Sequence, residues 1–351
     1  MLSIDSLLAM AGVTMKSTGK VLIGTMFWVG LVTTLLFLQL KKPHILIIHP
    51  FDPNDADAKL VDQGVKKFLD EKHSPVDVQW HYLNLQSYRS PSSVGVVYSN
   101  LRKVLDQYDP DVVVAVDDQS NIAAANVIRA YPNVRLLYAS LDATPDHYGY
   151  RKTSKISGII EVLPMQAVAD LLQQTYGGKP LRIGLLGTSA YTSTAEIEQV
   201  KQFPWYPHQL VRTQIVSTSS ELRNCVREFN ETVDVLLVIH YEGLGNATKK
   251  AAENNEETIR EIEQNFTGFP IGLQVSYVAN GGSFAIGPSR PAYGYLAMKM
   301  GLDWLDMRSG SDVPTPSKAA HYDVALREVP LKKRKLPIPS IYFEAARAGS
   351  M

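Results

Sequence analysis

The stretch DVVVAVDDQSNIAAANVIRA, residues 111–130, joins a short apolar run to an amphipathic one. Residues 112–116 are β-branched or small and uncharged, which is typical of a strand buried on both faces of a sheet. Residues 120–130 place apolar side chains at helical spacing, and Asp and Ser precede them, as at many helix starts. A buried strand that leads directly into a helix predicts a parallel α/β sheet.

The same order recurs along most of the chain. Besides residues 111–116, we expect strands at 45–49, 76–83, 134–141, 156–161, 182–186, 210–216, 235–239, 271–275, 283–286 and 322–326. We expect helices at 55–69, 94–107, 120–130, 165–175, 196–201, 219–229, 247–264 and 293–306. Two successive α/β halves predict two lobes, each a parallel sheet flanked by helices, with a cleft between them.

The length of 351 residues agrees with two domains, at ~150 residues for each. The late segments are expected to cross back between the lobes. We therefore expect an N-terminal tail at residues 1–20 and a membrane anchor at 21–40. The first lobe should comprise residues 44–150 with about 277–318. The second lobe should comprise residues 155–275 with about 320–348.

The segment Val21–Leu40 (VLIGTMFWVGLVTTLLFLQL) has twenty residues and no charge, close to the ~20 residues that cross a bilayer core. A buried core helix and a cleaved signal peptide are the alternatives. Signal-peptide apolar regions span ~7–15 residues and end in small residues, whereas this segment ends Phe-Leu-Gln-Leu. The sequence therefore predicts an uncleaved signal-anchor, a single transmembrane helix. Two lysines flank it on each side, which leaves its orientation open.

Composition and motifs disfavour several classes of function. Thirty-five basic and thirty-five acidic side chains give no basic excess, so we expect no nucleic-acid partner. The single cysteine, Cys225, excludes an internal disulfide and cysteine-cluster zinc sites. His44 and His49 share one predicted strand without a third ligand, and neither G-x-S-x-G nor H-E-x-x-H occurs. We predict no catalytic residue, no metal site and no cofactor.

Asp117 and Asp118 directly follow the strand at 111–116. Ligands of open parallel sheets bind outside the carboxyl ends of the strands, so these carboxylates are candidates for ligand contact. Aspartate also caps helices, and Asp118 could serve only that purpose. Asp117 is the freer of the two to face a ligand.

Two further strand ends carry polar residues. After the strand at 182–186 come Thr188, Ser189 and Tyr191, where hydroxyls and a helix N-terminus would suit a carboxylate or phosphate. An ordinary capped turn is the alternative there. After the strand at 235–239 come His240 and Tyr241, which have no nucleophile or metal partner at a recognisable spacing.

The ordered series of motifs resembles the substrate-binding proteins of bacterial ABC transporters, which have a leucine-binding-protein-like, periplasmic-binding-protein type I fold. The matching segments, which together span about 44–347, are DVVVAV with residues 123–126, Asp142, Ser157-Gly158, residues 182–186, residues 233–238, Gly281-Gly282, Gly287-Pro288, Tyr293-Gly294 and residues 336–339. The branch it resembles includes aromatic-amino-acid binders. Asp117 and Asp118 stand where family members commonly carry small residues and a threonine, so the resemblance implies the fold more than the ligand.

The resemblance implies a non-enzymatic protein at the bacterial inner membrane, with its soluble domain facing the periplasm or cell exterior. It would capture a small polar solute by hinge closure and present it to an ABC permease. A domain that senses a ligand and reports to a partner signalling protein is the alternative, and a hydrolase or transferase lacks a nucleophile–base pair. The expected ligand is amino-acid-like, because aspartates in one lobe suit an ammonium and hydroxyls in the other a carboxylate. The expected ligand-binding residues are Phe51, Asp117, Asp118, Ser140, Asp142, Thr188, Ser189, Tyr191, His240, Tyr241 and Gln274.

Overall fold

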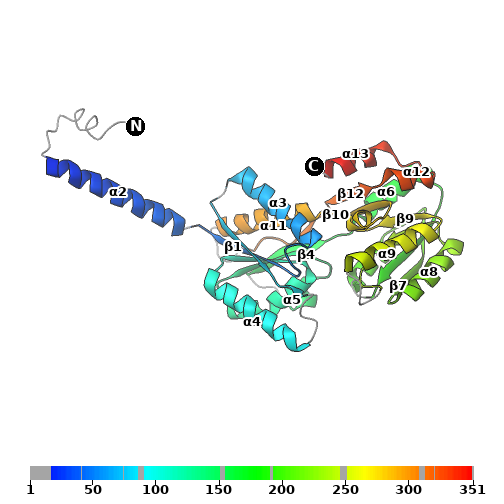
Figure 1. The fold of residues 1–351 in the computed structure, drawn as a ribbon, viewed down its shortest axis with the longest axis horizontal. Helices are drawn as coiled ribbons and strands as arrows, with labels where there is room; N and C mark the ends of the chain where they lie inside the picture. The colour runs from blue at the N-terminus through cyan, green and yellow to red at the C-terminus, as the bar shows by residue number, and fades with distance from the viewer. Residues whose placement is uncertain are drawn as a thin grey trace.

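The computed structural model describes residues 17–40, 42–73, 75–85, 91–150, 155–189, 193–245, 251–307, 313–319 and 321–349. Two six-stranded sheets, each covered by helices on both faces, form two lobes that lie side by side (Figure 1). The predicted two-lobed α/β architecture is confirmed.

The first lobe contains the sheet β11-β5-β4-β3-β1-β2, with all neighbours parallel. Its strands are β1 (His44–His49), β2 (Asp77–Tyr82), β3 (Val112–Val116), β4 (Arg135–Leu141), β5 (Ile156–Glu161) and β11 (Ser317–Ala319). Its helices are α3 (Ala56–Lys72), α4 (Pro91–Tyr108), α5 (Asp117–Val127), η2 (Ile128–Ala130), η3 (Pro145–Tyr148) and α11 (Arg290–Asp306). Side chains alternate along β1, so that Ile45 packs toward α3 and α11 while Leu46 packs toward α4 and α5.

The second lobe contains the sheet β12-β10-β9-β8-β6-β7, which is parallel except for the antiparallel pair β10–β12. Its strands are β6 (Arg182–Thr188), β7 (Gln209–Val216), β8 (Val235–Val238), β9 (Phe269–Gly272), β10 (Phe284–Pro288) and β12 (Tyr322–Leu326). Its helices are α6 (Met165–Tyr176), α7 (Thr194–Gln202), α8 (Ser219–Thr232), α9 (Ala251–Asn265), α10 (Ser276–Ala279), α12 (Glu328–Lys333) and α13 (Ser340–Gly349).

The chain crosses between the lobes from β5 to α6, from β10 to α11, and from β11 to β12. These crossings correct the expected lobe boundaries. β5 was expected in the second lobe, but it pairs with β4 in the first sheet. β10 was expected in the first lobe, but it pairs with β9 and β12 in the second. Strand pairing decides to which lobe a strand belongs, whereas the expected lobe boundaries were placed at polar loops.

Helices α3 and α11 pack unusually closely through two glycines. A Cβ atom on Gly64 would lie 1.8 Å from the carbonyl oxygen of Pro291, and one on Gly294 would lie 2.0 Å from that of Val61. Neither position has room for a side chain, so the glycines allow the two backbones to approach. This packing holds the first turn of α11, including Arg290, against the first lobe.

Residues 17–40 form one helix, α2 (Ser17–Leu40), which extends away from the first lobe (Figure 1). Its middle exposes large apolar side chains, including Met26, Phe27 and Trp28. Over the residues that the structure describes, no helix reaches the combination of length and hydropathy that a membrane crossing requires. The transmembrane anchor expected at residues 21–40 stays a prediction.

Candidate functional site

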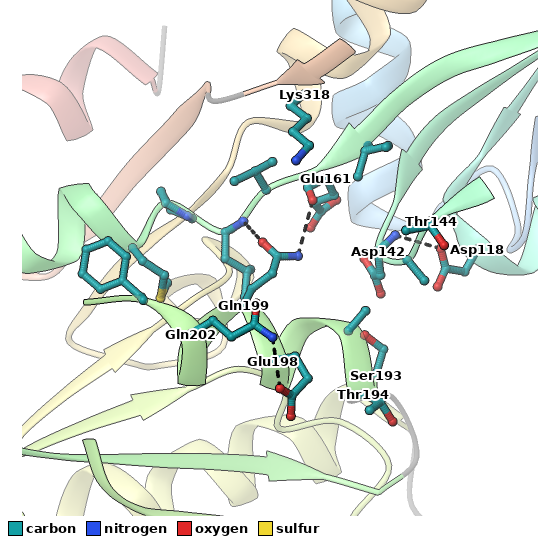
Figure 2. Close-up of a pocket in the computed structure, with 18 of the residues that line it drawn as sticks. Asp118, Asp142, Thr144, Glu161, Ser193, Thr194, Glu198, Gln199, Gln202 and Lys318 are labelled. Carbon is teal, nitrogen blue, oxygen red and sulfur yellow. Dashed lines mark hydrogen bonds between the residues drawn. The ribbon is translucent and has the colours of Figure 1, made fainter. Parts of the chain in front are cut away.

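A cavity of about 1390 Å³ lies where the two lobes meet. The first lobe contributes Asp118, Asp142 and Thr144, and the second contributes Ser193, Thr194 and the following turns of α7 (Figure 2). The crossing from β5 to α6 forms its base, with Glu161 and Leu163, and Lys318 of β11 lies beside Glu161 (Figure 2). A ligand in this cavity would contact both lobes and the segments that join them.

The wall formed by the first lobe is acidic. Asp118 lies in the first turn of α5, and its Oδ1 accepts a hydrogen bond of 3.1 Å from the backbone N–H of Asp142, which follows β4. Burial raises the pKa of both carboxyls, and Glu196, Glu161 and the neighbouring aspartates raise that of Asp142 further, well above its usual range. A cationic group in the cavity would stabilise the charged form of these carboxyls, which burial disfavours.

The alternative that Asp118 caps α5 is wrong. Val116 is the N-cap residue and has no side-chain capping bond. The helix start is held instead by Asn121, whose Nδ2 donates to the carbonyl oxygens of Ala115 and Asp117, 2.8 Å in each case. Asp118 lines the cavity and does not cap the helix.

Asp117 lies beside this wall but does not line the cavity. Its backbone is left-handed, with φ of 66°. The pKa of its carboxyl is raised to about 7, mainly by burial. The charge of Arg290 lowers this pKa, whereas the charges of Asp118 and Glu161 raise it. The prediction that Asp117 faces the ligand more directly than Asp118 is not met by this arrangement.

A buried network lies beneath the cavity at the crossing from β5 to α6. Nη1 of Arg290 donates to Oε2 of Glu161 (2.6 Å) and to Oγ of Ser140 (2.7 Å), and its Nε lies 3.4 Å from Oδ2 of Asp57. Ser140 also donates to Glu161 from a left-handed position, at an irregularity in the pairing of β4 with β5. Ser140 was predicted to contact the ligand, but its hydroxyl is used within the protein.

The second lobe carries a buried ion triad. His240 follows β8, and its Nε2 lies 3.1 Å from Oε1 of Glu196 while its Nδ1 lies 3.4 Å from Oε2 of Glu242. Nε2 of Gln274 lies 3.1 Å from Nδ1 of His240. Burial opposes the charged imidazole, but its hydrogen bonds with the two glutamates raise the pKa of His240 well above its usual value. His240 is the centre of this triad and Gln274 contacts it; both were predicted to contact ligand, and neither lines the cavity.

Helix α7 begins at a capping box. Oγ of Ser193 accepts from the backbone N–H of Glu196 (3.1 Å), and Oε2 of Glu196 accepts from the backbone N–H of Ser193 (2.9 Å). Oε1 of the same carboxylate contacts His240. The protein's own anion thus occupies the helix end at which we expected a ligand carboxylate.

Four further predicted residues, which the structure describes, are not at the cavity wall. Thr188 is buried at the end of β6, and the hydroxyl of Ser189 accepts from Ser217 (2.9 Å). Tyr241 is buried in the core of the second lobe and accepts from Asn280 (3.0 Å). Phe51 is half-buried after β1 and lines no part of the cavity. Tyr191 lies outside the described residues.

Sequence reasoning missed Glu161, Arg290 and Gln199. Oε1 of Gln199, on α7, accepts from the backbone N–H of Leu163 (2.9 Å), and its Nε2 donates to the carbonyl oxygen of Glu161 (3.4 Å). Gln199 thus connects the second lobe to the crossing segment. The signal for Glu161 was its place at the carboxyl end of a strand, but nothing in the sequence linked Gln199 or Arg290 to it.

No protein-family model and no curated protein matches the sequence. Among solved structures, the ligand-free, open form of CD0873, a substrate-binding protein with adhesive properties from Clostridium difficile, is 18% identical, with a TM-score of 0.63 over 85% of this chain and 96% of that one. The ABC domain from Streptococcus pneumonia in complex with L-Trp is 16% identical, with a TM-score of 0.59 over 87% and 99% of the two chains.

A third structure, the complex of the TorS sensor domain with TorT, includes a chain that is 12% identical, with a TM-score of 0.51 over 83% of this chain and 96% of that one. At these identities the likeness establishes the fold, and it singles out no branch such as the aromatic-amino-acid binders. The chain has the two-lobed α/β architecture that is found in type I substrate-binding proteins.

Proposed function

We propose that this protein is a solute-binding protein that captures a small ligand with a cationic group between its lobes. The observation that carries the proposal is the cavity itself. It contacts both lobes and the segments between them, and Asp118 and Asp142 form one wall. Carboxylates that are partly buried away from cations are suited to an ammonium group, which restores the charge balance that burial removes.

The proposed mechanism is hinge closure. A ligand that contacts both lobes only when they are close shifts the open–closed equilibrium toward the closed form. Glu196 of the second lobe raises the pKa of Asp142 in the first, so the two lobes carry charges of the same sign toward each other. A bound cation would lower this repulsion, and ligand binding and closure would favour each other.

The closed form would then be recognised by a partner, for which an ABC permease is the proposal. An amino-acid-like ligand, expected from the sequence, satisfies the requirement for an ammonium group. The alternative is that the closed form reports to a signalling protein without transport. Co-purification of the ligand-bound protein with a permease, against co-purification with a receptor kinase, distinguishes these two roles.

The experiment is a thermal-shift screen of amino acids, amines, sugars and nucleosides, followed by small-angle scattering with each compound that stabilises the protein. A ligand at 100 times its Kd adds ~2.7 kcal/mol to the free energy of unfolding. We expect the radius of gyration to decrease with a saturating ligand. Scattering curves that do not change with any stabilising compound would contradict hinge closure.

The control pair is Asp142→Asn and Asp146→Asn. Asp142 lines the cavity, whereas Asp146 is exposed on η3 and does not. Only the first substitution should weaken binding of a cationic ligand, by about tenfold or more, because a charge-assisted hydrogen bond becomes a neutral one. Equal effects of both would indicate that the ligand binds elsewhere.

Location at the bacterial inner membrane, with the two lobes outside the cytoplasm, is a separate proposal. The uncharged run at residues 21–40 of the sequence supports it. The protein should stay with membranes after an alkaline carbonate wash, and a variant without residues 1–41 should not. Release of the full chain by the wash would refute the proposal and leave the solute-binding proposal intact.

A further inference from the structure

We infer that the ligand is an organic amine with an apolar body and without a carboxylate, bound with its ammonium group at Asp118 and Asp142. This inference rests on the proposed function and names the ligand class of the same cavity. It differs from the amino-acid-like ligand in one chemical group, so the two can be separated by matched compounds.

The charges that line the cavity favour a cation without an anion. Its lining carboxylates are Asp118, Asp142, Glu161 and Glu198. Within the part of the chain that the structure describes, Lys318 is the one lysine or arginine of the lining. Lys318 lies beside Glu161 (Figure 2), so a ligand carboxylate placed there would also approach an anion.

Among the residues that the structure describes, the second lobe places a carboxylate of its own beside the expected carboxylate site. At the start of α7 the backbone N–H groups of Ser193 and Glu196 are paired in the capping box, and the carboxylate of Glu196 also contacts His240. A ligand carboxylate at this helix end would approach the carboxylate of Glu196 and would compete with it for the same donors. The hydroxyl groups of Ser193 and Thr194 remain in the lining, and they suit a neutral polar group or an ammonium equally.

The far end of the cavity is lined mainly by apolar side chains, next to the amides of Gln166 and Gln202. Helix α7 extends along it from Ser193 and Thr194, near Asp142, toward Gln202 (Figure 2). Phe203 and Pro204, just after the helix, line the cavity together with Leu163, Pro164 and Met165. At ~1.5 Å per residue, the ten steps along the chain from Ser193 to Phe203 span ~15 Å. A ligand with an ammonium group at one end and a ring or chain at the other therefore matches both ends.

The test compares phenethylamine with phenylalanine, which differs by the carboxylate, and with ethylamine, which lacks the apolar body. Calorimetry on the full chain should give phenethylamine a Kd at least tenfold lower than either. Phenylalanine binding as tightly as phenethylamine would overturn the inference, and so would ethylamine binding as tightly. The absence of measurable binding by phenethylamine would also overturn it.

Two outcomes separate this inference from the proposed function. If phenylalanine or another amino acid binds and compacts the protein while phenethylamine does not, the inference fails and the solute-binding function stands. If no compound of the solute screen binds, both fail. Lys318→Ala adds a second readout on a side chain that is exposed. A tenfold loss of phenylalanine affinity in this variant would show that Lys318 holds a ligand carboxylate and would overturn the inference.

Discussion

Nη1 of Arg290 donates to Oε2 of Glu161 over 2.6 Å, and the two residues are 129 positions apart in the sequence. Glu161 ends β5, just before the crossing to α6, and Arg290 begins α11, just after the crossing from β10. Both side chains are nearly buried, with 4% of Glu161 and 12% of Arg290 exposed. The ion pair therefore connects two of the segments about which the lobes would move.

Breaking this pair should destabilise the protein strongly. Arg290→Met leaves the buried carboxylate of Glu161 without its cation, which we expect to lower the free energy of unfolding by ~3–5 kcal/mol. Glu161→Gln should cost less, because Arg290 keeps its contacts with Asp57 and Ser140. Chemical denaturation of both single variants and the double variant gives the coupling energy.

The matched control is the exposed pair of Lys299 with Asp303 on the same helix, 2.6 Å apart. Lys299→Met should change the free energy of unfolding by less than ~1 kcal/mol. If Arg290→Met had an effect as small as the control, the buried pair would not stabilise the crossing segments.

Asp117→Asn should stabilise the ligand-free protein above neutral pH. The folded-state pKa of Asp117 is raised from 3.8 to about 7, so ionisation of this carboxyl reduces stability progressively as pH rises from about 4 to about 7. The difference between these two pKa values corresponds to a loss of at most ~4 kcal/mol in the free energy of unfolding. Asparagine tolerates the left-handed backbone and carries no charge. The melting temperature of the variant should exceed that of wild type at pH 8 and equal it at pH 4.

Asp109→Asn is the control for Asp117. Asp109 also has a left-handed backbone, with φ of 47°, but it is exposed at the end of α4. Its substitution should shift the melting temperature little at either pH. A pH-independent gain at Asp117 would mean that backbone preference, and not charge, is responsible.

His240→Gln should destabilise the protein more at pH 6 than at pH 9. The folded-state pKa of His240 is raised well above 6.5 through Glu196 and Glu242. The protonated imidazole of His240 therefore stabilises the folded protein fully below pH 6.5, and this stabilisation is lost as pH rises through the folded-state pKa. Urea denaturation at the two pH values measures the difference between variant and wild type. A loss of equal size at both would show that the charge of His240 does not stabilise the lobe.

Gly294→Ala should weaken the packing of α11 on α3. The added methyl group would lie 2.0 Å from the carbonyl oxygen of Val61, so the helices must separate, and we expect a loss of ~1–3 kcal/mol. Gly95→Ala, on the exposed surface of α4 with nothing within 4 Å, should instead stabilise by ~0.5–1 kcal/mol. Thermal denaturation of the two variants should therefore give shifts of opposite sign.

The sequence by itself determined most of the secondary structure and the class of the fold. Residues 112–116 form β3, as their apolar, β-branched pattern predicted, and residues 322–326 form β12 as expected. Hydrophobic periodicity is a local property, and burial on both sides of a parallel sheet leaves a local signature. For the same reason the carboxyl ends of strands indicated Asp118 and Asp142, which line the cavity.

Only the tertiary structure decided which lobe β5 and β10 join, because strand pairing depends on partners far away in sequence. It also decided that Arg290 meets Glu161. The capping box at the start of α7 is local, because Ser193 and Glu196 have the S-x-x-E spacing that a sequence shows. The contact of the same carboxylate with His240, 44 positions later, depends on packing and could not be predicted from that spacing.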